Sequence, residues 1–154
     1  MTTVVSVTCV YETYPASFRW DNGEFCLMDN RPTVVFADDN PKVVGVVCDL
    51  LKAAYRVVKV AADGEQSLRA VCELIPDFAI LDISMPKLDG FKVASRITKA
   101  GLPTRILFVT LINDEDYMEA AKSAGYGYVL KSRLSLDLLE ALSSAREGSF
   151  FCSR

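Results

Sequence analysis

The chain has 154 residues, a length that suits one domain of ordinary size. Hydrophobic residues make up 51% and charged residues 24%, and these near-average values exclude a wholly disordered or collagen-like protein. The formal net charge of −3 argues against DNA binding by this chain alone, because such domains carry a basic face. The sequence contains no histidine, which excludes Ser-His-Asp and Cys-His hydrolysis, His-ligated zinc and a phosphohistidine on this chain.

The cysteines and the lengths of the apolar runs indicate where in the cell the protein is expected. Five cysteines are scattered without Cys-x-x-Cys spacing, which is typical of a reduced, cytosolic protein. No stretch approaches the roughly 18 consecutive apolar residues of a membrane span, and the N-terminus lacks the positive segment of a signal peptide. We therefore expect a cytoplasmic protein that does not enter a membrane.

Residues 1–31 differ in texture from the rest and are expected to be an N-terminal extension, either a hairpin around Asp21-Asn22-Gly23 or a segment without fixed structure. From Arg31 onward, short apolar runs alternate with segments of helical period. Most of the runs are continuously hydrophobic, as in strands buried on both faces, although Lys59 marks the second as partly exposed. The five predicted strands are 33–37, 56–61, 78–81, 105–109 and 127–130.

The segments between these strands have apolar residues at helical spacing. Asn40-Pro41 is a good helix start, while Pro76, Gly101 and Gly125 mark helix ends. The predicted buried faces are Val43, Val47, Leu50 and Ala54; Leu68, Val71, Cys72 and Ile75; Val93, Ala94 and Ile97; Tyr117, Ala120, Ala121 and Ala124; and Leu138, Leu139, Leu142 and Ala145.

Five strands alternating with five helices predict an α/β fold: a doubly wound (βα)5 domain with a five-stranded parallel sheet of flavodoxin-like topology. Ligands of such folds bind at the carboxyl ends of the strands, near the point where the strand order reverses. The residues that follow each strand are therefore the candidate site.

Charged and hydroxyl side chains follow four of the predicted strands. They are Asp38 and Asp39, then Asp82, Thr110 and Lys131. Each alone is most simply a cap, a strand residue or a solvated lysine. Together they gather charge: two carboxylates 4 Å apart repel by about 4 kcal/mol at an effective dielectric of 20. A divalent cation and the ammonium group would neutralise that repulsion, and hard oxygen ligands favour Mg²⁺.

With these motifs in place, the chain resembles the receiver domains of bacterial two-component response regulators. The resemblance covers residues 32–147. It is carried by the acidic pair Asp38-Asp39, the stretch Asp82-Ile-Ser-Met-Pro-Lys-Leu-Asp-Gly90, the strand end Val109-Thr110 and the sequence Tyr128-Val-Leu-Lys131. The stretch after the third strand is the most specific of these motifs.

The resemblance implies a role for each of the acidic residues. Asp82 would be the phosphoacceptor, which takes a phosphoryl group from a phosphohistidine on a sensor histidine kinase. Asp39 would bind Mg²⁺ directly and Asp38 through water, and the ion would also take an oxygen of Asp82 and the backbone carbonyl of Ser84. Such a site works by positioning and charge neutralisation, and the protein would be a phosphoacceptor, not an enzyme.

The resemblance also implies a switch. Thr110 would hydrogen-bond the phosphoryl group and Lys131 would pair with it, while Tyr128 would turn inward into space that Thr110 vacates. Leu111 departs from the family pattern, which has a small residue there. We expect its side chain to narrow access to Asp82 and to prolong the phosphorylated state.

Residues 148–154 are similar to the exit from the receiver in LuxR/FixJ-type transcription factors, so they are expected to be the start of a linker or a C-terminal tail. DNA would then be bound only through a C-terminal domain outside this chain, and a homodimer is possible. The alternative is a stand-alone receiver, or a pseudo-receiver that acts through protein contacts without phosphorylation.

Two rivals share the topology. A haloacid dehalogenase-like phosphatase would need a second Asp where Asn40 stands, and a flavodoxin would need a phosphate-binding loop where Asp38 and Asp39 would repel the phosphate.

Overall fold

The computed structural model describes residues 18–21, 24–27 and 29–154, and the chain divides into two units, residues 1–31 and 32–154. In the first unit, β1 (Phe18–Asp21) pairs antiparallel with β2 (Glu24–Leu27), with Phe18 opposite Leu27. The hairpin alternative therefore holds for these eight residues. Residues 1–17, 22–23 and 28 of the predicted extension lie outside the described residues.

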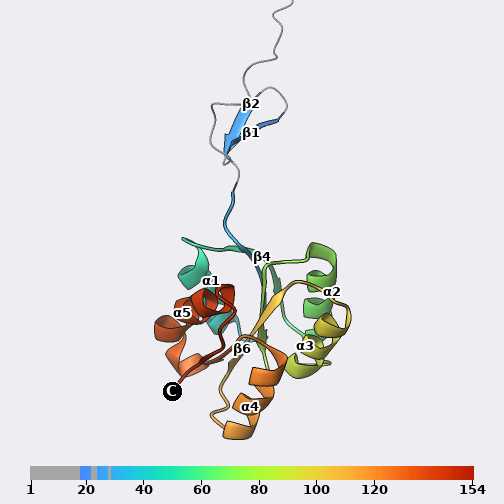
Figure 1. Cartoon of the computed structure of the whole chain (residues 1–154), viewed down its shortest axis with the longest axis vertical. Helices are drawn as coiled ribbons and strands as arrows, with labels where there is room; N and C mark the ends of the chain where they lie inside the picture. Colours follow the sequence, from blue (N-terminus) through green and yellow to red (C-terminus); the bar gives the residue numbers. More distant parts are fainter. Residues whose placement is uncertain (1–17, 22–23, 28) are drawn as a thin grey trace, which may run out of the picture. The chain divides into compact units, whose positions relative to one another are not determined.

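The second unit alternates strands and helices as the sequence predicts (Figure 1). Its sheet has the order β4-β3-β5-β6-β7-β8. Every neighbouring pair of strands in this sheet is parallel. The five predicted strands are confirmed, and β4, which contains Lys59, is a partly exposed edge strand. The elements are β3 (Thr33–Ala37), α1 (Pro41–Leu51), β4 (Arg56–Ala61), α2 (Gly64–Leu74), β5 (Phe78–Asp82), α3 (Gly90–Lys99), β6 (Arg105–Thr110), α4 (Glu115–Ala124), β7 (Gly127–Leu130), the 3₁₀ turn η1 (Lys131–Arg133), α5 (Leu134–Arg146) and β8 (Phe151–Cys152).

Helices cover both faces of the sheet (Figure 1). On one face, α1 and α5 pack Val47, Leu51 and Leu138 against the strands. On the other face, α2, α3 and α4 contribute Val71, Ile97 and other residues to a second core. This arrangement is the predicted doubly wound fold, in which the chain reverses direction across the sheet between β3 and β5. Among the residues that the structure describes, no helix has the length and hydropathy needed to cross a bilayer.

The helix starts agree better with the sequence prediction than the helix faces do. Asn40 caps α1, because its Oδ1 accepts a hydrogen bond from the Lys42 N–H at 3.0 Å. In α2, however, Cys72 is exposed, and Ile75, which directly follows the helix, is 52% exposed, so the predicted buried face was wrong at both. Val71 is buried as predicted, and the other buried residues of α2 are three small ones, Gly64, Ser67 and Ala70.

The predicted buried faces of α1, α4 and α5 contain further exceptions. Ala54 lies beyond the end of α1 and is exposed. In α4 only Ala121 is buried, while Tyr117 is 40% exposed; in α5, Leu139 is 44% exposed and Asp137 is buried. Hydrophobic spacing thus identified each helix but over-counted the apolar residues that face the sheet.

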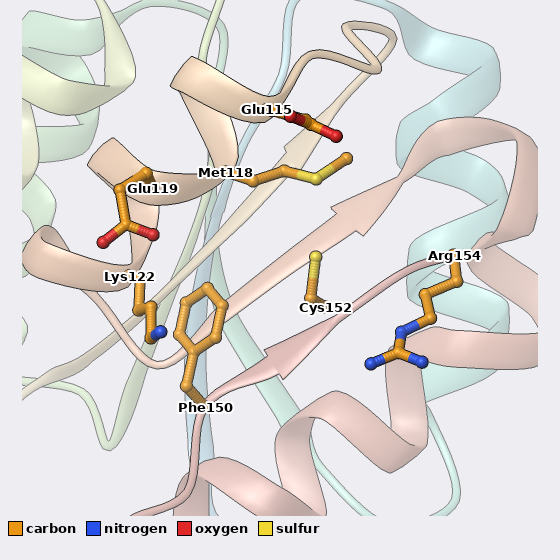
Figure 2. Close-up of a pocket in the computed structure, with 7 residues that line it drawn as sticks. All are labelled: Glu115, Met118, Glu119, Lys122, Phe150, Cys152 and Arg154. Atoms are coloured by element: carbon orange, nitrogen blue, oxygen red, sulfur yellow. The ribbon is translucent and has the colours of Figure 1, made fainter.

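The C-terminal segment differs most from the prediction. Residues 148–154 do not form a separate linker or tail: Phe151–Cys152 is a sixth parallel strand, β8, at the edge of the sheet. The Phe151 N–H donates to the Tyr126 carbonyl at 3.0 Å, and the Ser153 N–H donates to the Tyr128 carbonyl at 2.9 Å. A surface groove separates β8 from α4, and Figure 2 shows its lining residues, Glu115, Met118, Glu119, Lys122, Phe150, Cys152 and Arg154.

A buried polar contact holds β8 in place. Ser153 is 1% exposed; its Oγ donates to Asp137 Oδ2 at 2.6 Å and accepts from the Leu130 N–H at 3.1 Å. Asp137 also accepts hydrogen bonds from Arg133 at 2.8 and 3.2 Å. These contacts, with Arg133 making the largest contribution and Ser153 the next, hold the pKa of Asp137 below its usual value. The Asp137 carboxylate therefore joins α5, β7 and the C-terminal segment.

We expect Asp137→Ala to destabilise the fold by about 1–3 kcal/mol, because it leaves the buried Ser153 hydroxyl without its acceptor and removes the partner of the half-exposed Arg133. Urea unfolding measures the loss, with the exposed Ser143→Ala on the same helix as the control. Because the folded pKa of Asp137 is depressed, its ionic contribution exists above the ordinary value of about 4 and is lost as the pH falls through the folded pKa. Equal stability of the variant and the wild type at pH 7 would contradict this role.

Candidate functional site

Strand register brings the predicted site residues to one edge of the sheet. Ala37 of β3 pairs with Leu81 of β5, so the next residues, Asp38 and Asp82, end neighbouring strands. Asp82 in turn pairs with Val109 of β6, and the following Thr110 pairs with Leu130 of β7. Lys131 comes directly after Leu130. The parallel pairing therefore gathers the carboxylates, the hydroxyl and the ammonium at the carboxyl ends of four adjacent strands.

The carboxylates lie close together. Asp38, Asp39 and Asp82 each offer an oxygen, and these oxygens all lie within 4.8 Å of one another. Asp38 is 2% exposed and Asp82 is 3% exposed, whereas Asp39 faces solvent. Negative charge is thus concentrated where water cannot fully screen it.

The Lys131 ammonium lies between the two buried carboxylates. Its Nζ is 2.7 Å from Asp38 Oδ2 and 2.9 Å from Asp82 Oδ2, and its side chain is 9% exposed. Burial disfavours the charged lysine, but its contacts with Asp38 and Asp82 outweigh burial and raise the pKa of Lys131. Lys131 is therefore the positive charge that makes two buried carboxylates tolerable.

At Asp82, unlike at Lys131, burial has a larger effect on the pKa than the ionic contacts do. Its burial outweighs the hydrogen bond and charge of Lys131, so the pKa of Asp82 is raised. Its Oδ1 accepts a hydrogen bond from the Ser84 N–H at 3.2 Å, while Oδ2 faces Lys131. The carboxyl group is thus oriented at both oxygens.

The cluster fits a hard divalent cation. Three carboxylates and one ammonium leave a formal charge of −2, which such a cation would neutralise. All the nearby side-chain ligands are carboxylate oxygens, the type that hard cations prefer over nitrogen or sulfur. The residues present therefore suit an ion bound by Asp38, Asp39 and Asp82.

The side chains of Thr110 and Tyr128 both form hydrogen bonds with the backbone of Ile112. The Ile112 N–H donates to Thr110 Oγ1 at 3.1 Å, and its carbonyl accepts from the Tyr128 hydroxyl at 2.5 Å. Tyr128 is fully buried, and burial raises its pKa to about 12. The ring already has the inward position that the sequence prediction assigns to the phosphorylated state.

Leu111 and Ser84 lie at the surface beside the site. Leu111 is 79% exposed, and Ser84 is also exposed, although its N–H contacts Asp82. Most of the Leu111 side chain therefore projects into solvent, and its effect on access to Asp82 stays a prediction.

The specific stretch after β5 has a structural explanation that the sequence prediction did not include. The Gly90 N–H donates to the Ile83 carbonyl at 3.0 Å, and a Cβ at Gly90 would lie 2.5 Å from the Asp82 carbonyl oxygen. Asp89 caps α3 by accepting from the Lys92 N–H at 2.9 Å. The Asp-Gly pair thus fixes the start of α3 directly against the backbone of Asp82.

Comparison with known proteins agrees with this geometry. Residues 34–143 match the model of the response regulator receiver domain. The chain is 37% identical over 115 residues to the positive alginate biosynthesis regulatory protein of Pseudomonas aeruginosa, covering 73% of this chain and 46% of that protein. It is 33% identical over 124 residues to the nitrate/nitrite response regulator NarL of Escherichia coli, covering 79% and 57%. The chain spans about half the length of these curated relatives.

Solved structures show the same fold. The signal receiver domain of NarL from Mycobacterium tuberculosis has a TM-score of 0.72 and 30% identity, covering 77% of this chain and 98% of that one. A LuxR-family two-component response regulator from Aurantimonas sp. SI85-9A1 has a TM-score of 0.74 and 26% identity, covering 79% and 89%. The chain belongs to the response regulator receiver domain family.

Membership in this family confirms the predicted resemblance and decides against the haloacid dehalogenase and flavodoxin alternatives. The family is regulatory, and LuxR-family response regulators are among the structural neighbours, as the C-terminal motif predicted.

We expect Lys131→Met to reduce the free energy of unfolding by about 3–5 kcal/mol in EDTA, because Asp38 and Asp82 would be left buried without their counter-charge. Saturating Mg²⁺ should restore part of the loss by supplying another positive charge. Lys52→Met is the matched control: the Lys52–Asp49 pair is exposed on both sides, and such pairs contribute about 0–1 kcal/mol. A loss at Lys131 no larger than at Lys52 would contradict the electrostatic account.

Proposed function

We propose that this receiver domain accepts a phosphoryl group on Asp82 from a phosphohistidine of a sensor histidine kinase. The observation that carries the proposal is the buried Asp82 carboxylate, held between the Lys131 ammonium and the Ser84 N–H beside two further carboxylates. Family membership supports the same assignment. These 154 residues contain no histidine, so the phosphohistidine would lie outside this chain.

Mg²⁺ is the ion we propose for the acidic cluster. Asp39 would bind it directly, Asp38 through water, and Asp82 and the Ser84 carbonyl would complete the protein ligands. When bound, the ion neutralises charge on the transferring phosphoryl oxygens. The exposed position of Asp39 and the buried position of Asp38 accord with an ion at the surface of the cluster.

The transfer is a substitution at phosphorus. One Asp82 oxygen forms a P–O bond while the P–N bond of the phosphohistidine breaks, and the electron pair of that bond stays on the departing imidazole. Lys131, whose Nζ already contacts Asp82 Oδ2 at 2.9 Å, would pair with the phosphoryl oxygens. Thr110 would donate its hydroxyl to the same group. No residue needs to act as a general base, since a carboxylate is the nucleophile.

Signal output would begin at Thr110. In the structure Thr110 Oγ1 accepts from the Ile112 N–H. If the hydroxyl turns toward a phosphoryl group, the β6–α4 connection loses that contact and Tyr128, bonded to the Ile112 carbonyl, repacks with it. The face formed by α4, β7 and α5 would then present a changed surface to partners.

The partners follow from the family. The matched region spans 46% and 57% of two curated relatives, which are both regulators, and one neighbouring structure contains RcsB dimers bound to DNA. We propose that this receiver controls transcription through a C-terminal DNA-binding domain outside the chain, with a homodimer as one possible assembly. We further propose that it is a phosphoacceptor without enzymatic activity on other substrates, and its cytoplasmic location stays a prediction from the scattered cysteines.

A pseudo-receiver that signals without phosphorylation is the second candidate. It is favoured only by Leu111, which stands where the family has a small residue. A stand-alone receiver that acts through protein contacts is compatible with the same phosphoacceptor chemistry.

We expect incubation with Mg²⁺ and acetyl phosphate to add one phosphoryl group, because the site orients Asp82 for attack and compensates its charge. Intact-mass measurement detects the adduct, which should be stable to acid and labile to base, as an acyl phosphate is. Asp82→Asn should abolish it, whereas Asp77→Asn, at the opposite end of the sheet near Thr33, should not. An adduct that persists in Asp82→Asn would refute the assignment. If the wild type stays unmodified, a phosphorylated histidine kinase becomes the donor, and failure with both would favour the pseudo-receiver.

We expect Leu111→Ala to hydrolyse its acyl phosphate several-fold faster than the wild type, because the large side chain at the surface would restrict water at Asp82. The measurement is the loss of phosphoprotein over time after removal of the donor, with Leu136→Ala, another exposed leucine at 69%, as the control. Equal hydrolysis rates in all three proteins would reject a role for Leu111 in access.

A further inference from the structure

The loop that follows Asp82 is held by the first turn of α2, which is remote in sequence. Residues 83–89 connect β5 to α3 and include Ser84, whose N–H contacts Asp82 Oδ1. The α2 end of this contact is formed by Asp63 and Gly64, and the loop end by Pro86, Lys87 and Leu88. None of the five contacts Asp82 in the hydrogen bonds and ion pairs of the described residues.

An ion pair forms the first part of this contact. Lys87 Nζ donates to Asp63 Oδ2 at 2.8 Å, and the Asp63 side chain is 7% exposed. Asp63 Oδ1 also accepts from the Gln66 N–H at 2.8 Å, so the carboxylate that caps α2 is the one that binds the loop. The lysine, followed by the backbone of Gln66, holds the pKa of Asp63 below its usual value.

Backbone contact forms the second part. The Gly64 N–H donates to the Pro86 carbonyl at 3.3 Å, and a Cβ at Gly64 would lie 1.8 Å from the Leu88 carbonyl oxygen. Only glycine permits this approach of helix and loop. The close contact also explains why a glycine is buried at the start of α2.

Lys87 pays a conformational cost to make the pair. Its φ is +65°, in the left-handed region that glycine adopts readily and other residues rarely do. From that backbone conformation the Lys87 side chain reaches the Asp63 carboxylate at 2.8 Å. Asp63 and Lys87 thus help to hold the loop, although neither carries phosphotransfer chemistry itself.

We propose that Asp63 and Lys87 are positioning residues for the phosphoacceptor site, acting through the 83–89 loop to hold the Ser84 backbone beside Asp82. The inference rests on the proposed function, because it concerns the loop that would supply the Ser84 carbonyl to Mg²⁺. Loss of the ion pair should leave Asp38, Asp39 and Asp82 in place but loosen this loop ligand.

The experiment is Mg²⁺ titration of the whole chain by calorimetry, without a phosphodonor. We expect Lys87→Gln and Asp63→Asn each to weaken Mg²⁺ binding about 10-fold, the effect typical of removing a group that orients a metal ligand. The double variant should be no weaker than either single variant, because both remove the same contact. Lys92→Gln is the matched control: it breaks an exposed Lys–Asp pair at the other end of the same loop and should leave affinity within about 2-fold.

Urea unfolding in EDTA separates positioning from folding, and Lys87→Gln is suitable because that side chain is half exposed and keeps its aliphatic stem. Unchanged Mg²⁺ affinity in folded Lys87→Gln and Asp63→Asn, or additive losses in the double variant, would overturn the inference and leave the proposed function intact. A wild type that binds no Mg²⁺ and accepts no phosphoryl group would overturn both.

Discussion

The contact of Lys131 with Asp38 and Asp82 is the interaction on which the site depends. A parallel sheet of this topology brings the ends of β3 and β5 together, so acidic residues at both ends must lie close and partly buried. Without a counter-charge, their repulsion and desolvation would oppose folding. The ammonium supplies one positive charge from β7, two strands away from β5, and leaves the cluster short of neutrality by the charge of one divalent cation. Stability and ligand binding are thus consequences of the same arrangement.

The strands could be predicted from the sequence because a strand buried on both faces appears as a continuous apolar run. The clustering of the candidate site residues could be predicted because the residue after each run lies at the carboxyl end of its strand, and parallel strands end at the same edge of the sheet. The helix faces could not be predicted as well. The buried face of α2 begins with Gly64, because the loop after Asp82 approaches so closely that any side chain there would collide with the Leu88 carbonyl. Apolar spacing assigned Cys72 and Ile75 to that face because it registers hydrophobicity but not the distance between backbones.

The strand β8 was missed for a different reason. Two residues have no periodicity, and the feature that holds them is the polar Ser153, which bonds Asp137 and the backbone of Leu130. A buried serine and aspartate look like surface residues in a sequence. Their partners lie on α5 and β7, so only the folded arrangement shows that they belong to one hydrogen-bonded group.

The two ends of β7 connect the charged site to this edge of the sheet. Lys131 follows β7 and lies in the site. The backbone carbonyl of Tyr128 accepts a hydrogen bond from Ser153, next to β8, and the Tyr128 hydroxyl donates to the Ile112 carbonyl. Ile112 in turn donates to Thr110, which ends β6 beside Asp82. A displacement of the Thr110 hydroxyl therefore removes a hydrogen bond from the same residue that anchors the buried tyrosine. Because the ring is already fully buried, the change transmitted from the site would be a loss of this anchoring and not the burial of an exposed ring. Cys152, which pairs with Tyr128 across β7 and β8, lines the groove between α4 and β8 (Figure 2).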